Sequence, residues 1–157
     1  MTKLIIAVLG GTVLLMGGII VMDKGGVQAS GGQIELSPAT IDLGTVSMAN
    51  GNVKTTYQIK NIGKEALKID RVWTSCMCTT AVLKLGDKTS PAFGMHDSSS
   101  LWSQEIQSGE EALLEVTFDP ALHGPEGVGQ LTRAIYLSTS DPSHKKAEVR
   151  FNINVTP

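Results

Sequence analysis

Alternation of apolar and polar residues runs through most of the chain after residue 30 and restricts the fold to one built from β-strands. The segment 146–155 shows it most clearly. Its apolar residues, all of one parity, are Ala147, Val149, Phe151, Ile153 and Val155. Successive side chains of a strand point to opposite faces, so a period of two predicts a strand with one buried face. Outside the N-terminus, no segment has the period of 3.6 that is typical of an amphipathic helix.

The same pattern predicts seven or eight short strands separated by turn residues. They are expected at 40–46, 53–60, 66–74, 79–85, 112–118, 130–139 and 146–155, with a shorter one starting near Gln33. The turn-forming residues 61–64 predict a hairpin between the second and third of these. Val72 falls out of phase with Leu67 and Ile69, which indicates a bulge near 70–71. The pattern predicts an immunoglobulin-like β-sandwich.

The N-terminus carries a different signal. Residues 4–22 contain no charge, and nineteen residues of helix span about 29 Å, enough to cross a bilayer core. This length predicts an N-terminal transmembrane helix, whereas the small residues before Ser30 resemble the cleavage site of a signal peptide. Both readings stay open. The expected organisation is an anchor or signal segment at 1–24, a glycine-rich linker at 25–32 and one domain at 33–157.

Either reading predicts export. Lys3 stays on the cytoplasmic side, so we expect a single-pass protein of the bacterial inner membrane with its domain extracytoplasmic, or a secreted domain if the segment is cleaved. No cysteine comes directly after the apolar run, which excludes a lipid-anchored lipoprotein. The formal net charge is -2. Without a basic stripe to neutralise phosphates, a nucleic-acid partner is not expected.

Residues 86–109 interrupt the alternation. Segments of this length without a strand pattern are either functional or disordered in compact domains. This insertion carries Phe93 and Trp102, which are too apolar for a plain solvated linker. We therefore expect part of it to pack.

The only two cysteines of the chain are Cys76 and Cys78, at the end of a predicted strand. A disulfide between them would close a loop with a single intervening residue, so it would not staple the fold. If successive strands run antiparallel, the loop 119–129 returns to the same end of the sandwich and brings His123 close to the pair. The same topology places Met95 and His96 at the opposite end, unless the insertion folds back.

Three interpretations of the pair stay open. Cys76, Cys78 and His123 are a donor set for a soft ion, copper or zinc. The two thiols can also form a redox-active disulfide, because their expected separation lies in the allowed range. Finally, they can be buried thiols without a role. The chain contains no nucleophile elbow, zinc-protease motif or phosphate loop, so we expect no catalytic residues and no enzyme.

Several segments resemble a bacterial family. They are 41–46 (IDLGTV), 61–69 (NIGKEALKI), 74–79 (TSCMCT), 108–110 (SGE), 116–120 (VTFDP) and 138–142 (STSDP). In this order they resemble the domain of unknown function 1573 family, which is similar to the immunoglobulin-like domains of the ASPM, SPD-2 and Hydin type. The resemblance implies a sandwich of about seven strands and little about activity. The chain departs from the family at Met77, where a glycine is usual, and in the insertion 86–109.

These observations lead to one functional expectation and two alternatives. We expect a membrane-anchored, extracytoplasmic binding or structural module without catalysis, which associates with envelope proteins or with itself. The first alternative is a copper or zinc carrier or sensor that uses Cys76, Cys78 and His123. The second is thiol–disulfide exchange at the cysteine pair.

Overall fold

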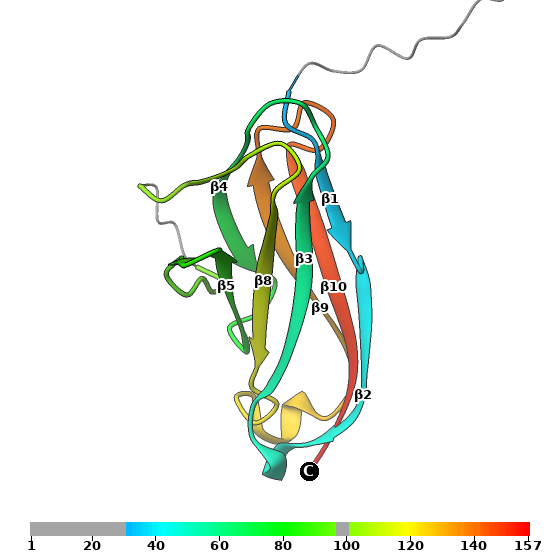
Figure 1. Ribbon diagram of the computed structural model, residues 1–157. Coiled ribbons are helices and arrows are strands. Elements are labelled where there is room, and N and C mark those ends of the chain that lie inside the picture. The colour runs from blue at the N-terminus through cyan, green and yellow to red at the C-terminus, as the bar shows by residue number, and fades with distance from the viewer. Residues whose placement is uncertain (1–30, 97–100) are drawn as a thin grey trace, which may run out of the picture.

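Two five-stranded sheets pack face to face in the computed structural model, which describes residues 31–96 and 101–157 (Figure 1). The predicted anchor or signal segment 1–24 and most of the linker 25–32 lie outside the described residues. Within the described ranges, no helix is long and apolar enough to cross a membrane. Residues 31–96 and 101–157 form an all-β sandwich.

The order of strands in each sheet follows from backbone pairing. The first sheet contains β1 (Ile34–Ser37), β3 (Val53–Asn61), β8 (Glu111–Phe118), β5 (Thr79–Leu85) and β6 (Lys88–Thr89), in this spatial order. The second contains β2 (Thr40–Ser47), β10 (Lys146–Thr156), β9 (Gly129–Thr139), β4 (Leu67–Thr74) and β7 (Gln104–Ile106). β2 runs parallel to β10, and the other neighbours are antiparallel. Two short 3-10 helices, η1 (Met48–Asn50) and η2 (Gly124–Gly127), lie in the connections.

The apolar positions of the alternating strands form the core between the sheets. Tyr57 of β3 is fully buried there, and its hydroxyl donates a 2.7 Å hydrogen bond to the carbonyl of Arg150 in β10. This bond joins the two sheets. Burial raises the pKa of Tyr57 to about 12, because the phenolate would lose its hydration. Phe118 and Phe151 meet edge-on from opposite sheets, with ring centroids 5.4 Å apart.

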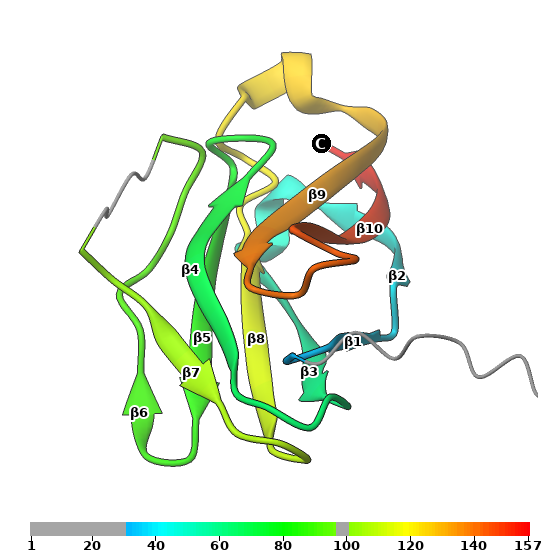
Figure 2. The same cartoon turned by 90° about the horizontal axis from the view of Figure 1, so that it is seen from above.

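The insertion 86–109 contributes two strands that the alternation did not predict. β6 pairs with β5, and β7 pairs with β4, so the described residues hold ten strands instead of seven or eight. Figure 2 shows β6 and β7 on the side of the molecule away from β2. Phe93 is buried, and its ring centroid lies 4.9 Å from that of Trp102. The expectation that part of the insertion packs is therefore confirmed.

The predicted hairpin between 53–60 and 66–74 is wrong, because β3 and β4 belong to different sheets. The bulge near 70–71 is confirmed by a shift of register between Ile69 and Arg71. At the crossover Asn61 is buried. Its side-chain oxygen accepts from the amides of Gln33 and Gly63, and its amide nitrogen donates to the carbonyls of Glu65 and Ile106. The turn residues 61–64 thus connect the first sheet to the second, and the side chain of Asn61 holds this connection in place.

A buried carboxylate joins the first strand to the turn between β9 and β10. Asp141 is 1% exposed and accepts hydrogen bonds from the backbone amides of Ile34, Ser143 and His144, and from the His144 ring. Burial by itself raises the pKa of Asp141. The hydrogen bonds together lower it by more than burial raises it, so the pKa lies below its ordinary value. The ionised carboxylate is therefore part of the folded structure.

Candidate functional site

The two cysteines lie in the connection from β4 to β5, which crosses from the second sheet to the first. The amide of Thr79 donates to the carbonyl of Cys76 at 3.2 Å. The hydroxyl of Thr74 lies 2.9 Å from the same carbonyl and 3.0 Å from that of Thr79. Ser75 exchanges two hydrogen bonds with Ala134 of β9. Because the turn is held on both sides, the cysteine side chains have a defined direction.

Cys76 and Cys78 form a disulfide, with their Cα atoms 5.2 Å apart. Both residues are buried, Cys76 at 9% exposure and Cys78 at 3%. The amide of Cys78 also donates to Sγ of Cys76 at 3.3 Å. Met77 between them is 59% exposed. The disulfide is therefore largely covered, whereas the side chain of the residue between the two cysteines is open to solvent.

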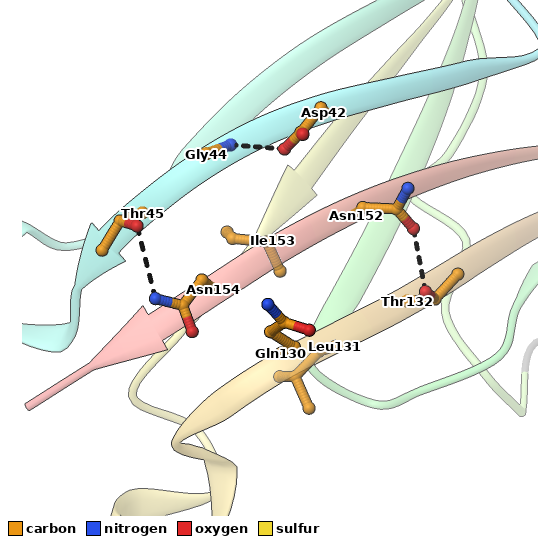
Figure 3. A pocket seen from close by; sticks show the side chains of 9 residues that line it. All are labelled: Asp42, Gly44, Thr45, Gln130, Leu131, Thr132, Asn152, Ile153 and Asn154. Atoms are coloured by element: carbon orange, nitrogen blue, oxygen red, sulfur yellow. Dashed lines mark hydrogen bonds between the residues drawn. The ribbon is translucent and has the colours of Figure 1, made fainter.

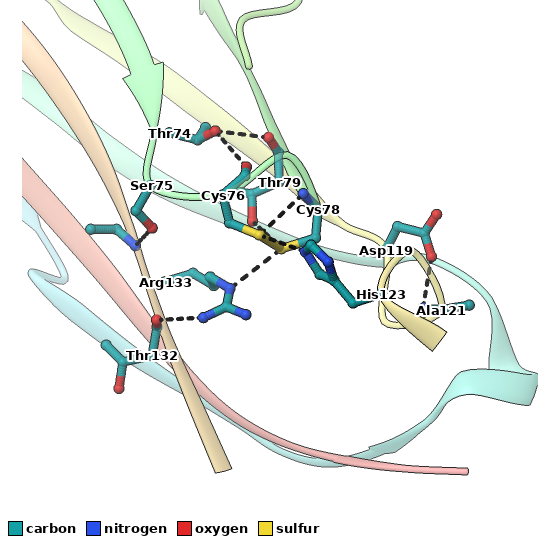
Figure 4. Close-up of a disulfide and its surroundings, with 11 residues drawn as sticks. Thr74, Ser75, Cys76, Cys78, Thr79, Asp119, Ala121, His123, Thr132 and Arg133 are labelled. Atoms are coloured by element: carbon teal, nitrogen blue, oxygen red, sulfur yellow. Dashed lines mark hydrogen bonds between the residues drawn. A yellow bond between two sulfur atoms is a disulfide. The ribbon is translucent and has the colours of Figure 1, made fainter. Parts of the chain in front are cut away.

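The loop after β8 brings His123 to the disulfide (Figure 4). Thr79 pairs with Phe118 in the first sheet, so Asp119 begins beside the cysteines, and its amide donates to the carbonyl of Cys78 at 2.8 Å. The Asp119 side chain then accepts from the amide of Ala121. His123 follows, and its Nε2 lies 3.1 Å from Sγ of Cys76.

Arg133 of β9 approaches the other sulfur. Its Nε donates to Sγ of Cys78 at 3.3 Å, and Nη1 donates to the carbonyl of Thr132 at 3.2 Å. Burial lowers the pKa of Arg133, yet a guanidinium stays charged in proteins at physiological pH. Arg133 was not among the site residues predicted from the sequence. The available signal was its position: Arg133 shares the inward-facing parity of Ile135 and Leu137, where a charged side chain is unusual.

The structure brings together the three residues that were predicted as a donor set. One side-chain atom each of Cys76, Cys78 and His123 lies within 4.8 Å of the other two, and no other such group of His, Cys, Asp or Glu occurs among the described residues. His96 is not part of it. The insertion does fold back, since the Thr74 amide donates to the Gly94 carbonyl at 3.2 Å, so His96 is nearer this end than strand order alone predicts.

The arrangement permits two chemistries, which depend on the oxidation state of the pair. As a disulfide, the pair can accept a thiolate from another molecule. As a dithiol, it offers two sulfurs whose thiolate forms are stabilised by a neighbouring cation and hydrogen-bond donors. In the reduced state, Cys76, Cys78 and His123 also present the sulfur and imidazole ligands that soft ions prefer. Thiolate coordination requires that the disulfide is first reduced.

A second concave feature lies on the outer face of the second sheet (Figure 3). This groove of about 620 Å³ lies over β2, β10 and β9, and its polar wall includes Asp42, Gln130 and Asn152. The side chain of Asn152 accepts a hydrogen bond from the Thr132 hydroxyl, and that of Asn154 donates one to the Thr45 hydroxyl. Such side chains are ordinary for a solvated sheet face. The cysteine end has the more distinctive chemistry.

The fold and the site define an immunoglobulin-like β-sandwich with a cysteine pair between its sheets at one end. Residues 34–88 match the family described as "Protein of unknown function (DUF1573)". The resemblance is thereby confirmed over this range, which includes Cys76 and Cys78. The resembling segments from Ser108 onward lie outside it. No curated protein matches the chain.

The solved structures to which this chain is similar include the following three. A protein of unknown function from Porphyromonas gingivalis W83 is 25% identical with a TM-score of 0.61, and the match covers 80% of this chain and 48% of that one. The present chain thus spans about half of its length. The VesB protease of Vibrio cholerae is 20% identical with a TM-score of 0.50, covering 78% and 32%. The PapD-like domain 7 of human CEP192 is 16% identical with a TM-score of 0.44, covering 78% and 83%. These similarities concern the sandwich and assign no activity to this chain.

Proposed function

We propose that this protein is a membrane-tethered, extracytoplasmic binding module whose Cys76–Cys78 pair exchanges disulfides with the thiols of other molecules. One observation carries the proposal: each sulfur of the pair has its own polar neighbour. His123 lies 3.1 Å from Sγ of Cys76, and Arg133 lies 3.3 Å from Sγ of Cys78. A disulfide that only holds a fold together has no need of such neighbours.

Two physical arguments favour exchange over a structural role. The ring closed by this disulfide contains three residues, and a ring of this size removes little entropy from the unfolded chain. In addition, the Arg133 cation stabilises a thiolate at Cys78, and stabilised thiolates are typical of exchanging cysteines. The pair is therefore better suited to reaction than to reinforcement.

The cellular part of the proposal rests on the sequence and on the disulfide together. The uncharged residues 4–22 favour a membrane anchor, and a disulfide persists in an oxidising compartment. We propose a single-pass protein of the bacterial inner membrane with its domain outside the cytoplasm, and envelope proteins or a second copy as its partners. Fractionation with protease treatment of intact spheroplasts tests this. Cleavage of residues 31–157 is expected, and protection of the domain would contradict it.

The exchange itself is tested by equilibration with glutathione. The purified full-length protein is incubated in buffers of increasing ratio of reduced to oxidised glutathione, and its free thiols are counted by mass spectrometry after alkylation. We expect a reversible transition between zero and two free thiols. A pair that stays closed in excess reduced glutathione, although the protein remains folded, would overturn the proposal.

A site for a soft metal ion is the second candidate function. It is favoured because one ligand atom each of Cys76, Cys78 and His123 lies within 4.8 Å of the other two. Reduced Cys76 and Cys78 with His123 would provide two sulfurs and one nitrogen, a set that suits copper(I) or zinc. A metal carrier or sensor would hold the pair reduced, whereas exchange needs it to cycle. The two candidates therefore predict different resting states of the same residues.

Elemental analysis distinguishes the metal site from disulfide exchange. Protein purified without added metal, under anaerobic conditions, is compared with the Cys76→Ser/Cys78→Ser double variant. Copper or zinc in a ratio near one to one, lost in the double variant, supports the metal site. Equal metal content in both proteins eliminates it.

A further inference from the structure

We infer that the thiol which this centre exchanges with belongs to a polypeptide, which docks on an apolar rim formed by Met77, Leu122 and Val128 and attacks Sγ of Cys76. This inference rests on the proposed exchange function and adds the class of substrate and the sulfur that reacts. It is carried by where the exposed apolar side chains lie and by the different surroundings of the two sulfurs.

Seven large apolar side chains are exposed in the described part of the chain, and three of them occupy the two loops that meet at the disulfide. They are Met77 at 59% exposure, Leu122 at 49% and Val128 at 42%. Met77 separates the cysteines, and Leu122 precedes the histidine that contacts Cys76. A polypeptide that approaches the disulfide would bury these side chains, whereas glutathione is small and charged and would gain little from them.

The two sulfurs of the disulfide differ in their surroundings. Cys76 is the more exposed of the two cysteines, and the residue beside it, His123, is itself exposed. Cys78 is nearly covered, and Arg133 donates to its sulfur from the interior side of β9. A leaving thiolate is favoured where a fixed cation receives its charge. The geometry therefore makes Cys76 the attacked sulfur and Cys78 the leaving sulfur.

The reaction balances without a further reagent. The partner thiolate forms a bond to Sγ of Cys76, the Cys76–Cys78 bond breaks, and its electron pair remains on Cys78 beside Arg133. A second partner thiolate then attacks the partner sulfur of this mixed disulfide and releases Cys76 as a thiolate beside His123. The partner loses two electrons as its two thiols become a disulfide, and the cysteine pair gains them. The protons of the two partner thiols pass to Cys76 and Cys78.

Competition between two reductants tests the docking. The oxidised full-length protein reacts either with reduced glutathione or with a cysteine peptide that carries apolar residues beside its thiol, and the rate constants are compared. In the Leu122→Ser/Val128→Ser double variant, we expect the peptide rate to fall about tenfold, because apolar contacts are lost. The glutathione rate should stay within about twofold. Ile62→Ser is the matched control, since Ile62 is exposed at the crossover between β3 and β4.

The outcomes separate this inference from the function on which it rests. If the peptide and glutathione react alike in the wild type and in the double variant, the docking rim is refuted and exchange stands. If neither reductant opens the disulfide, the exchange function fails, and the rim with it. If Ile62→Ser slows the peptide as much as the double variant does, the effect is not specific to the rim, and the rim is again refuted.

A second measurement identifies the attacked sulfur. The oxidised protein reacts briefly with the peptide thiol, is quenched in acid and is alkylated, and the fragment with both cysteines is sequenced by tandem mass spectrometry. We expect the peptide on Cys76 and the alkyl group on Cys78. The reverse distribution would overturn the assignment.

Discussion

Nε2 of His123 lies 3.1 Å from Sγ of Cys76, although 47 positions of the chain separate the two residues. Strand pairing produces this contact. Thr79 lies opposite Phe118 in the first sheet, so the turn before β5 and the loop after β8 leave the sandwich side by side. Arg133 completes the site from the second sheet. The cysteine pair thus lies where three separate segments of the chain meet.

Arg133 should control the rate at which the disulfide opens. Replacement by glutamine in Arg133→Gln removes the cation that faces Sγ of Cys78. We expect the second-order rate constant with glutathione to fall about tenfold, equivalent to about 1.4 kcal/mol of lost thiolate stabilisation. Arg133→Lys, which keeps the charge, should recover part of the rate. Arg71→Gln is the control, because Arg71 lies over Trp73 on the outer face, and an equal loss there would contradict the assignment.

The disulfide should add little to stability. For a ring of three residues, chain entropy predicts a contribution of about 1.6 kcal/mol at most. Urea unfolding is measured for the oxidised protein and for the reduced protein with unmodified thiols, in otherwise identical buffer. The difference between their free energies of unfolding is the contribution of the disulfide. A loss above about 3 kcal/mol on reduction would mean that the pair is a structural staple after all.

Tyr57→Phe removes the hydrogen bond that joins the two sheets through the carbonyl of Arg150. We expect the free energy of unfolding to fall by about 1–2 kcal/mol at pH 7. Because the pKa of Tyr57 is raised to about 12, its neutral form stabilises the fold below pH 10, and this stabilisation is lost as pH rises towards 12. Tyr136→Phe should change the free energy by less than about 0.5 kcal/mol. Equal effects of the two substitutions would contradict the role of Tyr57.

Asp141 should make the fold sensitive to acid. Its pKa is lowered in the native state, so its carboxylate stabilises the fold above the ordinary pKa, and this stabilisation is lost as pH falls through the native value. Asp141→Asn should lower the free energy of unfolding at pH 7 by about 1–3 kcal/mol and reduce its further decline between pH 5 and 2. Urea titrations across this range measure both, with exposed Asp87→Asn as the control. An unchanged acid dependence in Asp141→Asn would refute this role.

The strands were predictable from local sequence because burial on one face imposes alternation directly. Seven expected strands have counterparts within a few residues, from β2 to β10, and even the bulge near Asp70 was visible as a break in phase. β6 and β7 were not predictable, because strands of two and three residues are too short to show a period. Their existence depends on pairing with β5 and β4.

Sheet membership was harder to infer than strand position. Residues 61–64 have turn chemistry, which predicts a reversal of direction but does not reveal whether the next strand joins the same sheet. The decisive feature is the buried side chain of Asn61, which bonds to Gln33 and Ile106. These partners are distant in sequence, so only the folded chain identifies Asn61 as a bridge between segments.

Part of the candidate site could be predicted from the sequence. His123 could be placed near Cys76 from strand direction alone, because the direction of each strand determines the end at which its loop lies. The parity of Arg133 with Ile135 and Leu137 indicated an inward-facing side chain, but its contact with Cys78 is visible only in the folded chain. The formation of the disulfide depends on the geometry of the turn, which the sequence does not give. Thiol–disulfide exchange, the second alternative from the sequence, therefore becomes part of the proposed function of the expected binding module.

The proposed exchange makes the cysteine pair a reversible two-electron centre. The most direct test is the count of free thiols by mass spectrometry after the full-length protein equilibrates with graded ratios of reduced to oxidised glutathione. We expect a single reversible transition from zero to two free thiols, shifted in Arg133→Gln. A pair that remains closed at every ratio, or remains fully reduced at every ratio, would contradict it.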